Sequence, residues 1–277
     1  ETKSIIQHTY DPLNPLGITS PTVMTLYFDR SGLLWVGTWR GGVNTVAPRP
    51  FVHRQIIANS FILNNGAVSL LENHRGDLYI GTFLNGVWKY NFSTEALLHI
   101  PLPPIRDPMQ PASVRSNQIS TVERSDGRYI NQLQEDKTGT IWIRDGDNGE
   151  LIKYNPNSNR SSLVFRTPIT KTGFREYLGC FLLDGDGTVW VGSERKLYHI
   201  DPKGTVYSIS SSDQKNSKSL GPGSVNAILR DRSGTLWVGV SSGLHRFEEK
   251  SASFEKFQHI KNDSTSLSSN VVLNLLE

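Results

Sequence analysis

The sequence contains a single cysteine, Cys180, among its 277 residues. One cysteine excludes an intrachain disulfide and any zinc site built from several thiolates. Long apolar runs are absent too, and no segment approaches the roughly 18 consecutive apolar residues of a membrane helix. Membrane attachment would therefore have to come from segments that flank this chain. Cys180 stands in the apolar stretch 177–183, which predicts a buried and unreactive side chain.

Neither sign of charge dominates the chain. The 29 basic and 26 acidic side chains give a formal net charge of +3, and they form no long run of one sign. Nucleic acids and anionic membranes are bound by clustered Lys and Arg, so we expect neither as a partner. Hydrophobic residues make up 36% of the sequence and charged residues 20%, which permits a sizeable core and argues against global disorder.

The motifs of common enzymes and metal proteins are also missing. The seven histidines are scattered and form no HExxH pair. The DGDG sequence at 184–187 lacks the downstream pattern of an EF-hand and aligns with a turn that recurs elsewhere in the chain. There is no phosphate loop, no G-x-S-x-G elbow and no evident pair of catalytic carboxylates. We therefore expect no metal, no cofactor and no enzymatic activity in this chain.

What the sequence does contain is one phrase repeated five times. The anchoring aromatic residues are separated by 44, 63, 48 and 47 residues. The copies are DRSGLLWVGT at 29–38, NHRGDLYIGT at 73–82, DKTGTIWIRD at 136–145, DGDGTVWVGS at 184–193 and DRSGTLWVGV at 231–240. A period of about 40–50 residues with four short strands per unit is typical of the blades of a β-propeller.

Each copy has a residue pattern suited to a hairpin followed by a buried strand. In Asp-x-x-Gly the Asp accepts backbone N–H groups across a turn, and the Gly supplies a positive φ. The following apolar run does not alternate, as expected when both faces of a sheet are covered. A glycine inside that strand indicates close approach of another backbone or ring.

An apolar stretch precedes each copy, and two more strand-like stretches follow it. Four strands joined by short turns therefore form one unit, and no stretch resembles an amphipathic helix. The predicted repeats span residues 20–57, 64–102, 127–168, 177–210 and 222–260. Residues 3–10 match the last strand of a repeat and residues 269–277 match a first strand, which predicts a split blade. We expect a single incomplete β-propeller over 1–277, belonging to a protein with further blades.

The third repeat departs most from the pattern. Arg144 and Asp145 stand where the other copies carry Gly and a small residue, and the polar turn that follows contains Asp147 and Asn148. A long segment, 103–128, precedes this repeat. One interpretation directs Arg144 toward a ligand or a neighbouring module. The alternative is an ion pair with Asp145 or Asp147 in a divergent blade.

The turns that follow the Trp strand are expected to gather on one face of the propeller. They carry Trp39 and Arg40 in the first repeat, Phe83 and Asn85 in the second, and Glu194 and Arg195 in the fourth. Aromatic rings mixed with hydrogen-bonding groups suit contact with a sugar or a peptide. Docking of the next domain, or simple solvation, explains the same residues.

The phrase D-x-x-G-x-L-W-V-G-T, with the linker NDSTSLSSNVV at 262–272, resembles the two-component regulator propeller repeat. The resemblance covers nearly the whole chain, with departures at Asn73, Tyr79, Arg144 and Lys196. It implies a seven-bladed propeller in the periplasmic sensor region of a bacterial hybrid two-component receptor with a histidine kinase output. Such receptors detect glycan fragments, so the resemblance implies an oligosaccharide ligand. Similar propellers precede diguanylate cyclases.

Three functions remain open on the sequence. The first is a periplasmic sensor domain that binds a small ligand, expected to be an oligosaccharide. The second is a scaffold that binds only protein, such as a homodimer partner through the receptor ectodomain. The third is a propeller lyase or glycoside-acting enzyme, which would need acid and base groups converging near the central channel.

Overall fold

The computed structural model describes residues 7–11, 13–14, 17–46, 53–55, 66–105, 127–171, 173–210 and 219–277. Within these residues the chain forms twenty β-strands and no α-helix, hence no helix long and apolar enough to cross a membrane. The expected all-β class is confirmed. Most of the long segment before the third repeat, residues 106–126, lies outside the described residues.

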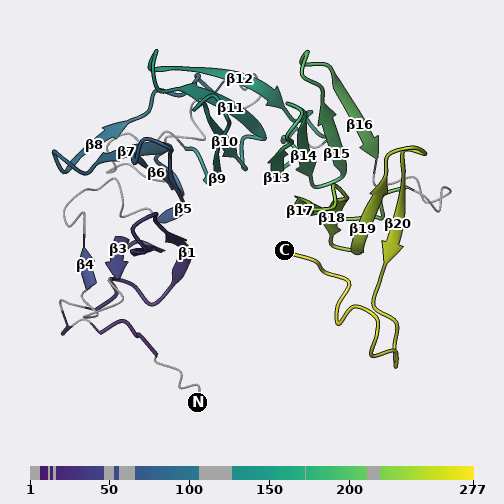
Figure 1. The fold of residues 1–277 in the computed structure, drawn as a ribbon, viewed down its shortest axis with the longest axis horizontal. Coiled ribbons are helices and arrows are strands. Elements are labelled where there is room, and N and C mark those ends of the chain that lie inside the picture. The colour runs from purple at the N-terminus through teal and green to yellow at the C-terminus, as the bar shows by residue number, and fades with distance from the viewer. Residues whose placement is uncertain are drawn as a thin grey trace. The chain divides into compact units, whose positions relative to one another are not determined.

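The strands form five antiparallel sheets, each built from four consecutive strands (Figure 1). The first contains β1 (Val23–Phe28), β2 (Leu34–Thr38), β3 (Gly42–Val46) and β4 (His53–Gln55). The second contains β5 (Ala67–Glu72), β6 (Leu78–Thr82), β7 (Val87–Asn91) and β8 (Ala96–His99). The third contains β9 (Ile130–Glu135), β10 (Ile141–Asp145), β11 (Glu150–Asn155) and β12 (Arg160–Arg166).

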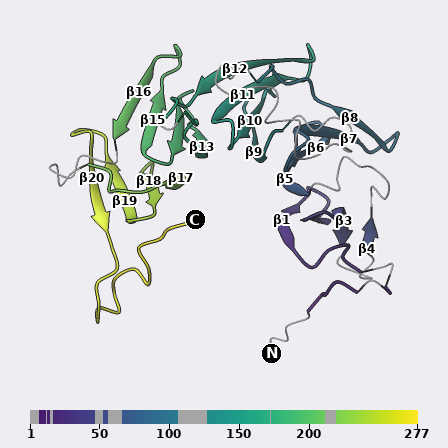
Figure 2. The same cartoon turned by 180° about the vertical axis from the view of Figure 1, so that it is seen from behind.

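The fourth sheet contains β13 (Leu178–Leu183), β14 (Val189–Ser193), β15 (Lys196–Ile200) and β16 (Val206–Ser210). The fifth contains β17 (Val225–Arg230), β18 (Leu236–Val240), β19 (Gly243–Glu248) and β20 (Ser253–Phe257). In every sheet the strands are hydrogen-bonded in chain order. Figure 2 shows the same five sheets from behind. Four strands per repeat is the arrangement that the recurring phrase predicts.

The chain divides into two compact units. The first comprises residues 1–145 and 151–163, and the second comprises residues 146–150 and 164–277. In the first unit β1 lies beside β5, and β5 lies beside β9. In the second unit β13 and β14 both lie beside β17. Successive sheets within a unit therefore pack against each other through their first strands.

The turn that opens the first repeated phrase is fixed by Asp29. One oxygen of Asp29 accepts the backbone N–H groups of Ser31 and Leu33, both at 2.9 Å. Its other oxygen accepts the indole N–H of Trp35 at 2.8 Å, a bond that the sequence pattern did not predict. Gly32 completes the turn with a φ of 83°. Burial acts to raise the pKa of Asp29, but hydrogen bonds from Ser31 and Trp35 outweigh it and hold the pKa below its usual value.

The strand after the turn is buried on both faces, and its glycine is the point of closest approach between sheets. A Cβ on Gly37 would lie 2.7 Å from the carbonyl oxygen of Ala67, at the start of β5. A Cβ on Gly81 would lie 2.4 Å from the carbonyl oxygen of Ile130, at the start of β9. The predicted close approach is thus confirmed. It lets the first strand of the following sheet lie against the middle of the preceding sheet.

The core of each unit lies between these sheets. In the first unit Trp35 packs edge-on against Phe92, in the turn after β7 of the second repeat, with ring centroids 5.5 Å apart. In the second unit Trp190 packs against Phe247 of the fifth sheet at 5.4 Å. Cys180 is buried within an apolar cluster of the second unit, as expected. Trp35 and Trp190 are therefore each covered by an aromatic ring of the following repeat.

The two predicted strands of a split blade differ from expectation. Residues 3–6 lie outside the described part of the chain, and residues 7–10 are not in a strand. Residues 269–277 belong to no sheet, because no described segment pairs with them. They nevertheless run along the fifth sheet. The backbone N–H of Val272 donates to the carbonyl of Val240 at 3.2 Å, and Glu277 accepts the backbone N–H of Arg232 at 2.9 Å.

Candidate ligand-binding site

The first unit brings the turns of successive sheets together at one end of their strands. The backbone N–H of Trp39, just after β2, donates to the carbonyl of Thr22, just before β1. In the second sheet the N–H of Phe83, just after β6, donates to the carbonyl of Gly66, just before β5. The end of each second strand is thereby tied to the start of the first strand beside it. Side chains at these positions gather where the sheets meet.

Three aromatic side chains form a continuous row at this end of the first unit. The Trp39 and Phe83 ring centroids are 4.6 Å apart at an interplanar angle of 69°. The Phe83 and Tyr129 centroids are 5.1 Å apart at 65°. All three residues are partly exposed. We call Trp39, Phe83 and Tyr129 the aromatic row.

The row depends on a glycine at its edge. Gly66 has a φ of 86°, and a Cβ built on it would lie 3.3 Å from the Trp39 ring. A side chain here would meet both backbone strain and the indole. Gly66 therefore leaves room for Trp39 to reach Phe83.

Arg40 stands at one end of the row in an unusual backbone conformation. Its φ is 58°, in the left-handed region that residues other than Gly, Asn and Asp rarely occupy. Its side chain is exposed, and its guanidinium carbon lies 6.0 Å from the centre of the Trp39 ring. That distance is at the outer limit of a cation–π contact.

Behind the row the polar residues are buried and bonded within the protein. Asn85 is 4% exposed, and its backbone forms an isolated bridge with Arg128. The Arg128 guanidinium lies 2.8 Å from the Asp145 carboxylate. Arg144 is also buried, and its Nε donates to the Asn131 side chain at 2.8 Å. These groups stabilise the base of the site rather than face solvent.

The remaining predicted residues lie in the second unit. Asp147 is exposed and Asn148 is partly exposed, in the turn between β10 and β11. Glu194 and Arg195 are exposed in the turn between β14 and β15. The N–H of Glu194 donates to the carbonyl of Tyr177 at 3.2 Å, which repeats the tie seen at Trp39. Of the predicted residues, the structure brings together Trp39, Phe83 and Asn85. Asp145 lies behind them, where it is joined to Asn85 by way of Arg128.

Tyr129 is the site residue that sequence reasoning missed. It directly precedes β9, where the corresponding positions carry Thr22, Gly66, Tyr177 and Ser224. An aromatic residue at the start of a strand-like stretch is ordinarily assigned to that strand. Comparison of this one position across the repeats would have marked Tyr129 as a turn residue next to Phe83.

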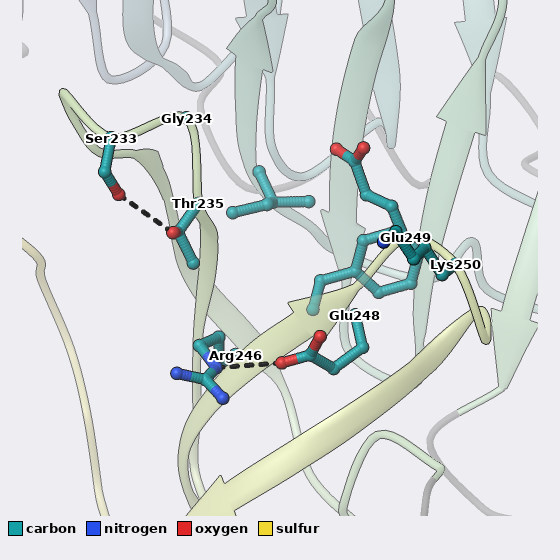
Figure 3. A pocket seen from close by; sticks show the side chains of 9 residues that line it. Ser233, Gly234, Thr235, Arg246, Glu248, Glu249 and Lys250 are labelled. Carbon is teal, nitrogen blue, oxygen red and sulfur yellow. Dashed lines mark hydrogen bonds and ion pairs between the residues drawn. The ribbon is translucent and has the colours of Figure 1, made fainter.

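A hollow of about 500 Å³ lies elsewhere, on the fifth sheet (Figure 3). It is lined by Ser233, Thr235, Arg246, Glu248 and Lys250, among others. Its polar groups already bind one another: Arg246 Nε donates to Glu248 at 2.9 Å, and the Ser233 and Thr235 hydroxyls are 3.0 Å apart. No predicted site residue lines it. We therefore centre the candidate site on the aromatic row.

Nowhere in the described residues do three His, Cys, Asp or Glu side chains converge as a metal site.

Comparison with known proteins agrees with this repeat architecture. Residues 17–40 and 219–242 match the family model of the two-component regulator propeller. The two matched segments lie in the first and fifth repeats. No curated protein matches it in sequence.

Solved structures that resemble the chain are β-propellers and receptor ectodomains. The extracellular domain of the putative hybrid two-component system BT3049 from B. thetaiotaomicron has a TM-score of 0.67 and 14% identity, over 97% of this chain and 33% of that one. The extracellular domain of BT4673 from the same organism, a putative one-component system, has a TM-score of 0.56 and 16% identity, over 92% and 36%. Virginiamycin B lyase from Staphylococcus aureus has a TM-score of 0.60 and 11% identity, over 87% and 71%.

These likenesses show the fold. The chain has a β-propeller fold, as the phrase predicts, and it spans about a third of the two receptor ectodomain chains. A propeller of seven blades stays a prediction.

Proposed function

We propose that the chain is the ligand-sensing, extracytoplasmic propeller of a bacterial signal-transduction receptor, a hybrid two-component system, and that it binds glycan fragments. The family match and the likeness to two receptor ectodomains support the sensor assignment. A periplasmic location follows from the same proposal. The output would be a histidine kinase, with a diguanylate cyclase as the alternative.

The aromatic row carries the glycan part of the proposal. Aromatic side chains with a few polar neighbours are typical of small-ligand sites. Trp39, Phe83 and Tyr129 lie in mutual contact, and all remain partly exposed. An apolar face of a sugar ring can stack on such side chains, while hydroxyl groups bind the surrounding polar groups and water.

Isothermal titration against a panel of acidic, neutral and host glycans tests this function. We expect one class to bind and the Trp39→Ala variant to weaken that binding at least tenfold, because stacking on a large aromatic ring is lost. Phe174→Ala is the matched control, since Phe174 is 66% exposed and lies outside the row. Silence across the whole panel would contradict the proposal.

A protein-binding scaffold is the second candidate, and one observation favours it. The β1 strand exposes Leu26 by 61% and Phe28 by 67%, which is unusual for large apolar side chains on a single strand. A homodimer formed through this surface would dissociate in a Leu26→Glu variant. Sedimentation velocity on the wild-type and variant proteins separates the two candidates: a dimer that Leu26→Glu disrupts, with no glycan binding, favours the scaffold.

A further inference from the structure

We propose that the aromatic row accepts an acidic oligosaccharide, with one sugar ring on Trp39 and its carboxylate or sulfate group bound by Arg40. This inference rests on the proposed glycan-binding function and names the charge of the ligand. Three observations carry it: the conformation of Arg40, the charge around it and the geometry of the row.

The backbone conformation of Arg40 is the first observation. The turn reads Trp39-Arg40-Gly41-Gly42, so glycine is used at two of the positions where the chain is most sharply bent. Arg40 nevertheless occupies the left-handed region, with a φ of 58°, where glycine would be unstrained. Strained residues of this kind are held in place by the surrounding structure, and they cluster at ligand-binding and switch positions. At Arg40 the strained residue carries a guanidinium beside the row.

The second observation is electrostatic. Arg40 has no carboxylate partner among the residues that the structure describes. The turns 39–42 and 83–86 contain no acidic residue. Asp145, which lies behind the row, is buried and bonded to Arg128. An exposed guanidinium with no acidic neighbour attracts an anionic group from solution, and its planar fork suits a carboxylate or sulfate.

The geometry of the row is the third observation. Consecutive ring centroids are 4.6 and 5.1 Å apart, so the row provides separate contacts along its length. Trp39 is the ring nearest the guanidinium, with 6.0 Å between the ring centre and the Arg40 carbon. A sugar ring on Trp39 therefore places a substituent of that ring within reach of Arg40. Phe83 and Tyr129 can then contact the next sugar of the oligosaccharide.

Matched pairs of probes test the charge directly. Trigalacturonic acid is compared with its methyl ester, and a sulfated chondroitin disaccharide with the unsulfated one, by isothermal titration at two salt concentrations. We expect the acidic member of at least one pair to bind about tenfold or more tightly, as a charge-assisted hydrogen bond provides. We also expect added salt to reduce that difference.

Variants of Arg40 assign the preference to this residue. Arg40→Asn removes the charge but tolerates the left-handed conformation, so it should abolish the acidic preference while the protein stays as stable as the wild type in urea. Arg40→Lys should retain part of the preference. Arg232→Asn is the control, because Arg232 is an exposed arginine remote in sequence from the row, with 84% of its side chain accessible.

The outcomes distinguish this inference from the function on which it rests. Neutral probes that bind as well as acidic ones, with Arg40→Asn unchanged, overturn the acidic ligand and leave glycan sensing standing. A preference for acidic probes that survives in Arg40→Asn overturns the role of Arg40. If no probe of either charge binds while another glycan of the panel does, the acidic ligand is overturned and glycan sensing stands; silence across the whole panel overturns both.

Discussion

The guanidinium Nη1 of Arg128 lies 2.8 Å from the carboxylate Oδ2 of Asp145, and the two side chains are 2% and 0% exposed. The same guanidinium also donates to the carbonyl of Pro103. This buried pair joins the segment before β9 to the end of β10, directly behind the aromatic row. Each charge is stable there only because the other compensates it.

Removing one partner of this pair should be strongly destabilising. Arg128→Met leaves the Asp145 carboxylate buried without its cation, so the free energy of unfolding should fall by about 3–5 kcal/mol in urea denaturation. Arg246→Met is the control. Arg246 pairs with Glu248 and Glu255 on the surface, where such pairs contribute at most about 1 kcal/mol.

The double variant Arg128→Met, Asp145→Leu removes both charges and should recover much of the lost stability. Equal effects of Arg128→Met and Arg246→Met would show that the Arg128 pair contributes no more than a surface contact.

Tyr79 predicts a variant that stabilises the protein. Its ring replaces the usual Trp and is fully buried, but among the described residues its hydroxyl has no hydrogen-bond partner. Burial raises the pKa of this hydroxyl, which is therefore neutral. Tyr79→Phe removes an unsatisfied polar group and should raise the free energy of unfolding by about 1 kcal/mol.

Tyr154 provides the matched control for this substitution. Its ring contacts Tyr79 at 6.3 Å, and its hydroxyl donates to Asn159 at 3.0 Å. Tyr154→Phe loses that bond and should lower the free energy of unfolding by about 1 kcal/mol. Both values come from the same denaturation series. Destabilisation by Tyr79→Phe would mean that its hydroxyl is bonded in solution.

The glycine in the buried strand predicts a severe packing defect. In Gly81→Ala the new Cβ would lie 2.4 Å from the backbone oxygen of Ile130, which cannot move without disturbing β9. We expect the free energy of unfolding to fall by about 1–3 kcal/mol or more, as overpacking does. Gly185→Ala is the control, because nothing lies within 4 Å of its Cβ position. It should change stability by less than about 1 kcal/mol, and equal effects of both variants would refute the close contact.

The repeated hairpins could be predicted because their determinants are local. Asp29 and Gly32 lie within one turn, and their preferences do not depend on the rest of the fold. The bond from Trp35 to Asp29 could not be predicted, because six residues separate them and the hairpin must form before the side chains meet. The same bond recurs from Trp142 to Asp136 at 2.8 Å.

The candidate site could be predicted only in part, because its contacts link different repeats. Trp39 and Phe83 differ from the small residues expected in a turn, which marks them in the sequence. Their contact with each other depends on how one sheet packs on the next. Tyr129 was hidden at the edge of a strand-like stretch. Arg144 was expected to meet a ligand or an acidic neighbour, and in the structure it binds the Asn131 side chain on the adjacent strand.

His245 makes the stability of the second unit depend on pH. It is fully buried in β19, and its Nε2 accepts the backbone N–H of Gly221 at 3.2 Å. Nδ1 has no partner among the described residues. Burial, together with the positive charge of Lys256 opposite it on β20, lowers the pKa of His245 to about 4. In the native protein the imidazole of His245 is therefore neutral, and its Nε2 must stay unprotonated to accept the N–H of Gly221.

The sign of the pH dependence follows from this lowered pKa. Between about pH 6.5 and pH 4 the unfolded chain binds a proton at His245 and the native chain does not, so stability falls as the pH drops through this window. The stability that depends on a neutral His245 is fully present above pH 7. About 3 kcal/mol of it is lost by pH 4. Hydrogen bonds from Ser233 and Trp237 lower the pKa of Asp231 to about 2, so this group begins to contribute to the loss only near pH 4 and does so equally in a His245 variant.

His245→Asn isolates this effect from all other titrations. Asparagine cannot bind a proton in this range, yet its carbonyl can accept the N–H of Gly221. The first sheet carries an asparagine at the equivalent position: Asn44 stands opposite Val36 as His245 stands opposite Val238, and its amide Nδ2 donates to the Thr19 hydroxyl at 2.8 Å. Urea denaturation of both proteins at pH 7, 6, 5 and 4 measures the difference. We expect the wild type to lose about 3 kcal/mol relative to His245→Asn over this range, and parallel curves would show that His245 is solvated or already charged.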